Sequence, residues 1–64
     1  MIRINGEELE LDQISLKEYL DGNGYDARRI AVECNETIVP KSQFDRFLLH
    51  AGDVVEIVSF VGGG

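Results

Sequence analysis

Few residues in this chain have side chains that could do chemistry, and Cys34 is the first candidate. It is the only cysteine. It alternates with Ile30 and Val32, as it would in a β-strand, and neither sequence neighbour is basic. A free cysteine in such a setting is usually buried and acts as a small apolar residue. We therefore interpret Cys34 as part of the core, not as a nucleophile.

The single histidine and the early carboxylates do not form an active site either. His50 stands alone on a turn, and no residue near it in the sequence would orient it as a base, so we expect a surface or capping role. One cysteine and one histidine cannot build a zinc or iron–sulfur cluster, so we predict no bound metal or cofactor. The acidic residues near the start are typical of the solvated side of a hairpin. They are Glu7, Glu8, Glu10 and Asp12.

The last residues of the sequence offer a different chemistry. Gly62, Gly63 and Gly64 directly follow the apolar pair Phe60-Val61. One interpretation is a frayed end. However, three glycines span about 10 Å when extended, and a peptide without Cβ atoms can enter a narrow slot in another protein. We expect the ionised carboxylate of Gly64 to be the reacting group. A partner enzyme would activate it with ATP as an acyl-adenylate.

Length, net charge and cysteine count limit the kind of protein to which this glycine tail belongs. Sixty-four residues make one domain with a small core, which we divide into a folded part, 1–61, and a flexible tail, 62–64. The net charge of −6 argues against nucleic acid or an anionic membrane as partner. The start lacks a signal-peptide pattern, and no apolar run reaches the ~20 residues of a membrane span. The single cysteine excludes an internal disulfide, so we expect a cytoplasmic protein.

The first half of the sequence predicts a hairpin followed by a helix. Asn5-Gly6 is a strong signal for a type I′ turn, which joins residues 2–4 to residues 7–11. That turn sets the pairs Ile4 with Glu7 and Ile2 with Leu9, and so gathers the apolar side chains on one face. Ser15 and Glu18 form a capping box that starts a helix. Its apolar stripe is Leu16, Tyr19 and Leu20, and residues 21–24 end it.

The second half predicts three strands. Residues 30–34 alternate, and residues 37–39 form a short strand that Pro40 stops. Residues 41–49 leave a 3₁₀ turn and a loop as alternatives. The longest strand covers 54–61, and its apolar residues occupy both alternating sets, so we expect a central strand partly covered on both faces.

This order of elements favours an α+β fold. Sequential strands tend to pair, and the one main helix must cover an apolar sheet face. We predict a mixed sheet of four to five strands with the helix packed across it, and with the first and last strands adjacent. This is the ubiquitin-like β-grasp arrangement, with the glycine tail leaving from the final strand.

With the tail on such a domain, the chain resembles the ThiS/MoaD-type sulfur-carrier family, most of all the carriers of thiamine biosynthesis. The resemblance covers nearly the whole chain except residues 22–29. Phe44 departs from it, because such carriers often have a tryptophan there. The matching segments are 2–6, 38–44 (Ile-Val-Pro-Lys-Ser-Gln-Phe), 52–58 (Gly-Asp-Val-Val-Glu-Ile-Val) and 60–64 (Phe-Val-Gly-Gly-Gly).

The resemblance implies a carrier protein that is the substrate of other enzymes. A ThiF-like enzyme would adenylate Gly64, and sulfur that originates from a cysteine desulfurase would replace the adenylate to give a thiocarboxylate. A ThiG-like thiazole synthase would then take up the sulfur, and Phe60 and Val61 are candidate docking residues. Two alternatives stay open. One is a carrier for molybdopterin, a tungsten cofactor, cysteine synthesis or tRNA thiolation; the other is a β-grasp interaction module that transfers nothing.

Overall fold

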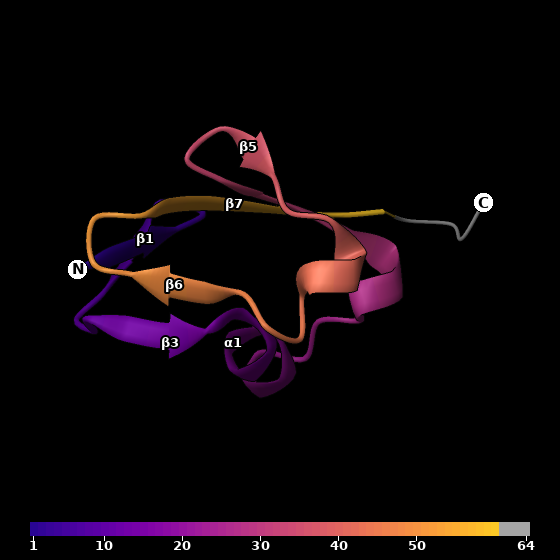
Figure 1. The fold of residues 1–64 in the computed structure, drawn as a ribbon, viewed down its shortest axis with the longest axis horizontal. Helices are drawn as coiled ribbons and strands as arrows, with labels where there is room; N and C mark the ends of the chain where they lie inside the picture. Colours follow the sequence, from indigo (N-terminus) through magenta and orange to yellow (C-terminus); the bar gives the residue numbers. More distant parts are fainter. Residues whose placement is uncertain (61–64) are drawn as a thin grey trace.

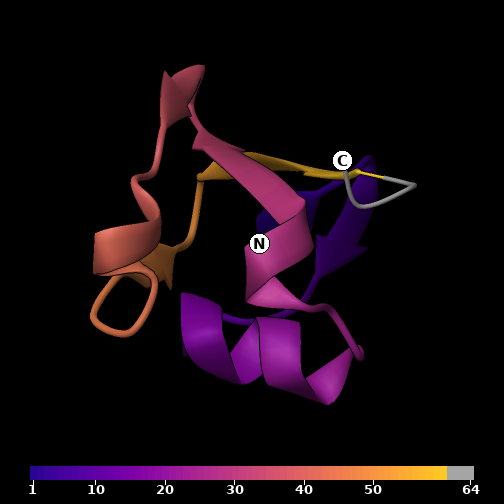
Figure 2. The same cartoon turned by 90° about the vertical axis from the view of Figure 1, so that its right-hand side faces the viewer.

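A five-stranded mixed sheet with one α-helix on one side forms the body of the protein (Figures 1 and 2). The structure is a computed structural model, and it describes residues 1–60. In chain order the elements are β1 Ile2–Ile4, β2 Glu7–Leu9, β3 Gln13–Ser15, α1 Leu16–Gly22, the 3₁₀ helix η1 Ala27–Arg29, β4 Ile30–Cys34, β5 Thr37–Ile38, the 3₁₀ helix η2 Lys41–Gln43, β6 Leu48–His50 and β7 Val54–Ser59.

The strand order of the large sheet is β2-β1-β7-β4-β5. The first and last strands, β1 and β7, lie side by side and run parallel. Every other neighbouring pair in this sheet is antiparallel. The predicted α+β architecture is therefore confirmed, including the number of strands and the central place of the last one.

The hairpin has the predicted register. Ile2 pairs with Leu9 and Ile4 with Glu7. Asn5 and Gly6 have φ angles of 50° and 83°, as a type I′ turn requires. The second strand ends at Leu9, earlier than predicted.

Helix α1 begins where the capping box predicts. The Ser15 hydroxyl accepts a hydrogen bond from the backbone N–H of Glu18 at 3.1 Å. At the other end Asn23 has a φ of −110°, and only Gly24, at +74°, is left-handed. The N–H of the next residue then donates back to the carbonyl of Leu20 at 3.0 Å. This is the Schellman pattern, which satisfies carbonyls at the helix end.

A second, two-stranded sheet of β3 and β6 was not predicted. It pairs Gln13–Ser15 with Leu48–His50, antiparallel. Residues 41–49, which the sequence left open between a 3₁₀ turn and a loop, begin with the 3₁₀ helix η2 and end with β6. Strands of three residues show too little alternation to be recognised, and this pair joins segments far apart in the chain. Leu49, in β6, is fully buried.

Two predictions about the later strands were wrong. Strand β7 ends at Ser59, and only one of its faces is covered: Val55 and Ile57 are buried, whereas Val54 and Val58 are 44% and 56% exposed. Apolar residues at alternate positions on both faces of β7 suggested that both faces are covered. However, helix α1 and the β3–β6 pair lie on the same side of the large sheet (Figures 1 and 2). The other error concerns the short strand predicted for residues 37–39, which ends one residue earlier, because β5 stops before Val39.

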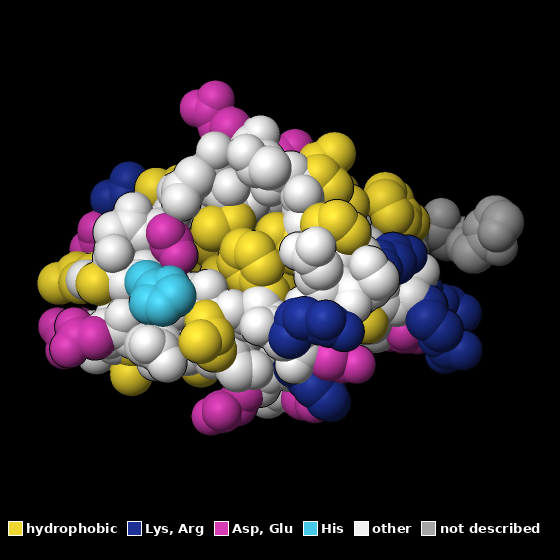
Figure 3. All heavy atoms as spheres, in the orientation of Figure 1, with side chains coloured by type: hydrophobic (Ala, Val, Ile, Leu, Met, Phe, Trp, Pro, Cys, Tyr) yellow, Lys and Arg dark blue, Asp and Glu magenta, His cyan; other side chains and the backbone are white. Residues whose placement is uncertain are grey.

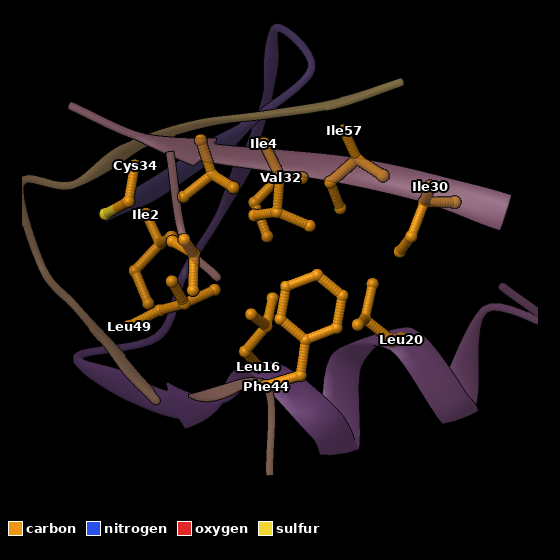
Figure 4. Close-up of a cluster of buried hydrophobic side chains, with 12 residues drawn as sticks. Ile2, Ile4, Leu16, Leu20, Ile30, Val32, Cys34, Phe44, Leu49 and Ile57 are labelled. Carbon is orange, nitrogen blue, oxygen red and sulfur yellow. The ribbon is translucent and has the colours of Figure 1, made fainter. Parts of the chain in front are cut away.

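The core lies between the covered face of the sheet and α1 (Figure 4). Phe44 points into its centre, between the helix residues Leu16 and Leu20 and the sheet, and is 4% exposed. The buried apolar residues are Ile2, Ile4, Leu16, Leu20, Ile30, Val32, Cys34, Val39, Phe44, Leu49, Val55 and Ile57.

Candidate functional site

The candidate site lies where the central strand β7 ends. Phe60 directly follows the strand, and its backbone N–H donates to the carbonyl of Arg29 at 2.7 Å. Its side chain is 54% exposed and is not part of the buried core, whereas its docking role stays a prediction. The other predicted site residues, Val61, Gly62, Gly63 and Gly64, lie outside the described residues. The structure thus places the base of the predicted tail beside η1, at one end of the sheet.

An asparagine side chain helps to hold β7 in place. Strand β1 ends at Ile4, opposite Val55, so it offers no backbone partner to Ile57. The Asn5 side chain takes that place: its Oδ1 accepts from the N–H of Ile57 at 2.7 Å, and its Nδ2 donates to the carbonyl of Ile57 at 3.2 Å. The sequence predicted Asn5 only as a turn residue. Because the Asn-Gly turn pattern already accounts for an asparagine at this position, nothing in the sequence indicated that its side chain also binds β7.

Cys34 is a core residue, as interpreted from its alternation. It is 8% exposed and belongs to the hydrophobic cluster (Figure 4). Burial raises the pKa of its thiol, and the negative charge of Asp53 raises it further. A thiol with a raised pKa stays protonated at neutral pH and is a poor nucleophile.

His50 ends strand β6 and does not lie in the turn itself, which corrects the prediction. Its backbone N–H donates to Asp53 Oδ2 at 2.8 Å. Asn35 Nδ2 donates to Asp53 Oδ1 at 3.0 Å, and Asn35 Oδ1 accepts from the N–H of Val54 at 2.9 Å. Asp53 and Asn35 therefore join the turn before β7 to the turn after β4. The predicted Gly-Asp turn has a structural role, at the end of β7 opposite to Phe60.

Asp53 makes this junction sensitive to acid. Partial burial acts to raise its pKa, but the hydrogen bonds from the His50 backbone and the Asn35 amide outweigh it, and the pKa ends below the usual 3.8. A carboxylate with a lowered pKa in the folded state stabilises the protein above its unfolded-state pKa. This stability disappears as the pH falls through the folded-state value.

We therefore expect Asp53→Asn to destabilise the protein in a pH-dependent way. At neutral pH it should lower the free energy of unfolding by about 1–2 kcal/mol, because hydrogen bonds to a charged group are lost. Below the folded-state pKa the wild-type carboxyl is also neutral, so the two proteins should converge. Urea denaturation of both proteins over a series of pH values from neutral downward measures the difference. A loss that stays equal at every pH would contradict the assigned charge effect.

Within residues 1–60 the structure brings together no group of three or more His, Cys, Asp or Glu side chains that could hold a metal ion. Nor does that part of the chain contain a helix long and apolar enough to cross a membrane.

The fold and the exposed end of its central strand define a ubiquitin-like β-grasp protein. The chain belongs to the ThiS family, whose family model matches residues 2–64. It is 36% identical over 64 residues to the sulfur carrier protein ThiS of Thermus thermophilus, and the match covers 100% of both chains. The crystal structure of the thiamine biosynthesis protein ThiS from Geobacter metallireducens superimposes with a TM-score of 0.76 at 27% identity, and covers 98% of this chain and 97% of that one.

A further relative is much longer. The chain is 47% identical over 62 residues to a protein of Paramagnetospirillum magneticum named thiazole synthase; the match covers 95% of this chain and 19% of that protein. The chain thus spans about a fifth of that relative's length. The family model and the relatives named sulfur carrier protein ThiS confirm the resemblance drawn from the sequence: the chain belongs to the ThiS sulfur-carrier family of thiamine biosynthesis.

Proposed function

We propose that this chain carries sulfur as a thiocarboxylate on Gly64 and donates it to thiazole formation in thiamine biosynthesis. The observation that carries the proposal is the family match, which runs from Ile2 through the glycine tail to Gly64. The fold supports it, because the central strand of the sheet ends at the base of that tail, beside an exposed Phe60.

The chemistry takes place at the carboxylate of Gly64, with Gly64 as the carboxyl terminus. On a ThiF-like enzyme the carboxylate oxygen attacks the α-phosphate of ATP, and pyrophosphate leaves. A persulfide, whose outer sulfur a cysteine desulfurase supplies, then displaces AMP at the carbonyl carbon and forms an acyl disulfide. A thiol reductant cleaves the S–S bond, which leaves the thiocarboxylate on Gly64 and a disulfide on the sulfur donor. ATP is a substrate of the partner enzyme, and the carrier itself binds no cofactor in this scheme. Without Cβ atoms, Gly62 and Gly63 let the backbone pass through a narrow entrance to that active site.

The proposed sulfur acceptor is a ThiG-like thiazole synthase. Two relatives named thiazole synthase contain a segment similar to this chain, at 47% and 33% identity. A carrier-like segment within a protein named thiazole synthase supports the proposal that carrier and synthase act together. We assign Phe60 and Val61 to the contact with these partners, and the cytoplasm as the place where they meet.

The same observations favour thiazole formation over the alternatives. A carrier for molybdopterin, a tungsten cofactor, cysteine synthesis or tRNA thiolation would use the same tail chemistry. Two relatives that match over their full length and one solved structure, however, are named for ThiS and thiamine biosynthesis. A β-grasp module that only binds a partner would not need its glycines. Sulfur attachment at Gly64 would therefore distinguish a carrier from such a module.

Intact mass spectrometry of the protein from its native cells, grown without thiamine, tests the proposal. We expect a species about 16 Da heavier than the unmodified chain, because sulfur replaces one oxygen of the ionised terminal carboxylate. A variant that lacks Gly64 serves as the control and should show only the unmodified mass. Absence of the heavier species under thiamine starvation, or its presence in the variant, would contradict sulfur attachment at Gly64.

A further inference from the structure

The end of β7 that leads to the tail is held along one edge by the segment before β4. The N–H of Phe60 donates to the carbonyl of Arg29 at 2.7 Å. Lys41, in η2, contacts the same segment, because its Nζ donates to the carbonyl of Arg28 at 3.0 Å. Most Lys and Arg atoms in Figure 3 lie in the half of the molecule toward this end. On this edge the chain is therefore bound as far as the last described residue.

The opposite edge of β7 loses its neighbouring strand earlier. Strand β1 ends at Ile4, opposite Val55, whereas β7 continues to Ser59 (Figure 1). Backbone groups of alternate residues in a strand point to opposite edges, so Ile57 and Ser59 direct theirs toward the side where β1 has ended. Within residues 1–60, the Asn5 side chain is the last group that binds this edge, and it does so at Ile57.

Asn5 continues the parallel ladder of β1 with its side chain. Its backbone N–H donates to the carbonyl of Val55 at 2.9 Å, and in a parallel ladder the carbonyl of the same residue would accept from Ile57. Here the φ of Asn5, 50°, belongs to the hairpin turn, and Oδ1 accepts that bond at 2.7 Å. Nδ2 completes the pair by donating to the carbonyl of Ile57 at 3.2 Å. The turn alone would also accept glycine or aspartate, but neither glycine nor an ionised aspartate can both accept and donate here.

We propose that Asn5 is a positioning residue for adenylation: by binding Ile57 it sets the direction in which β7 points the tail at the activating enzyme. This inference rests on the proposed function. Ile57 lies about 10 Å before Phe60 along the strand, and residues 61–64 span at most about 14 Å when extended. A strand end that swings away from the sheet shortens the distance that this tail can reach. Because a misplacement of about 1 Å can cost about a hundredfold in rate, the bonds from Asn5 act on the chemical step.

Asn5→Gly tests the proposal, because glycine keeps the type I′ turn and removes both bonds to Ile57. The readout is ATP–pyrophosphate exchange with the activating enzyme, with the carrier as the varied substrate. We expect kcat to fall about tenfold, because the carboxylate is less often in place for attack. Misfolding alone would act differently. An unfolded fraction lowers the effective concentration of the carrier, which raises the KM and leaves kcat unchanged.

Asn35→Gly is the matched control. Asn35 also begins a turn with a positive φ, 53°, and its Oδ1 accepts from the N–H of Val54 at 2.9 Å. The same substitution therefore removes a side-chain contact with β7, but at the start of the strand, away from the tail. We expect it to leave kcat at the wild-type value.

Amide hydrogen exchange, followed by NMR, measures the contact itself. The N–H of Ile57 should exchange about tenfold faster in Asn5→Gly than in the wild type or in Asn35→Gly, because it has lost its acceptor. Unchanged exchange at Ile57 would mean that Asn5 does not hold the strand, and would overturn the proposal.

The kinetic outcomes separate this proposal from the proposed function. An unchanged kcat in Asn5→Gly, or an equal fall of kcat in both variants, overturns the positioning role and leaves the proposed function intact. A wild type that is not adenylated would refute the proposed function, and with it the role of Asn5 in adenylation, even where exchange at Ile57 confirms the contact.

Discussion

Deletion of Gly63 and Gly64 is expected to abolish adenylation of the carrier while its melting temperature stays the same. The proposed reaction needs the carboxylate at the end of a slender peptide, and two residues fewer shorten its reach by about 7 Å. An in-line attack tolerates no such displacement, because reacting atoms must approach to about 3–3.5 Å. The loss should therefore appear in ATP–pyrophosphate exchange with the activating enzyme as a fall to background.

Extension of the chain by one tryptophan after Gly64 provides a second test of the same requirement. It keeps all three glycines but moves the carboxylate outward and adds a bulky side chain at the tip, so we expect exchange to fall to background again. The circular dichroism spectra of both variants should match the wild type, because the buried core cluster of the described residues lies between Ile2 and Ile57. Undiminished exchange in either variant would refute the carrier function proposed for Gly64.

The second large effect is expected in the core, where Phe44→Ala should leave much of the protein unfolded at 37 °C. Phe44 is 4% exposed and fills the space between α1 and the sheet (Figure 4). Truncation of a buried phenylalanine to alanine costs about 3–5 kcal/mol. A domain of this size has about 3–5 kcal/mol of stability in total. The expected loss of stability is therefore about as large as the total free energy of unfolding.

Phe60→Ala is the matched control for that experiment, because it makes the same chemical change at a side chain that is 54% exposed. We expect its urea midpoint to stay close to the wild type, whereas Phe44→Ala should show a far lower midpoint or no transition at all. Phe44→Leu should fall between them, since it retains part of the buried volume. Equal midpoints for the two alanine variants would mean that Phe44 is not the centre of the core.

Features that depend on a few neighbouring residues were predicted correctly from the sequence. Asn5-Gly6 set the turn type and hence the register of the first hairpin, and Ser15 with Glu18 marked the start of the helix. These signals are local, because a turn needs particular φ angles and a helix start needs particular hydrogen-bond acceptors. The glycine tail was also recognisable, since its chemistry follows from composition alone, although it lies outside the described residues.

Features that depend on distant partners were not predictable in this way. The pairing of β3 with β6 joins short segments with no alternation of their own. The second role of Asn5 depends on Ile57, which lies 52 residues later in the chain. The apolar residues of β7 looked alike on both faces, and only the packing of α1 and the β3–β6 pair on one side distinguished the core face from the exposed face. The sequence alone therefore predicted a reacting group at Gly64 and identified the strand that leads to it. The folded arrangement determined which face of that strand stays exposed, because burial depends on how the layers assemble.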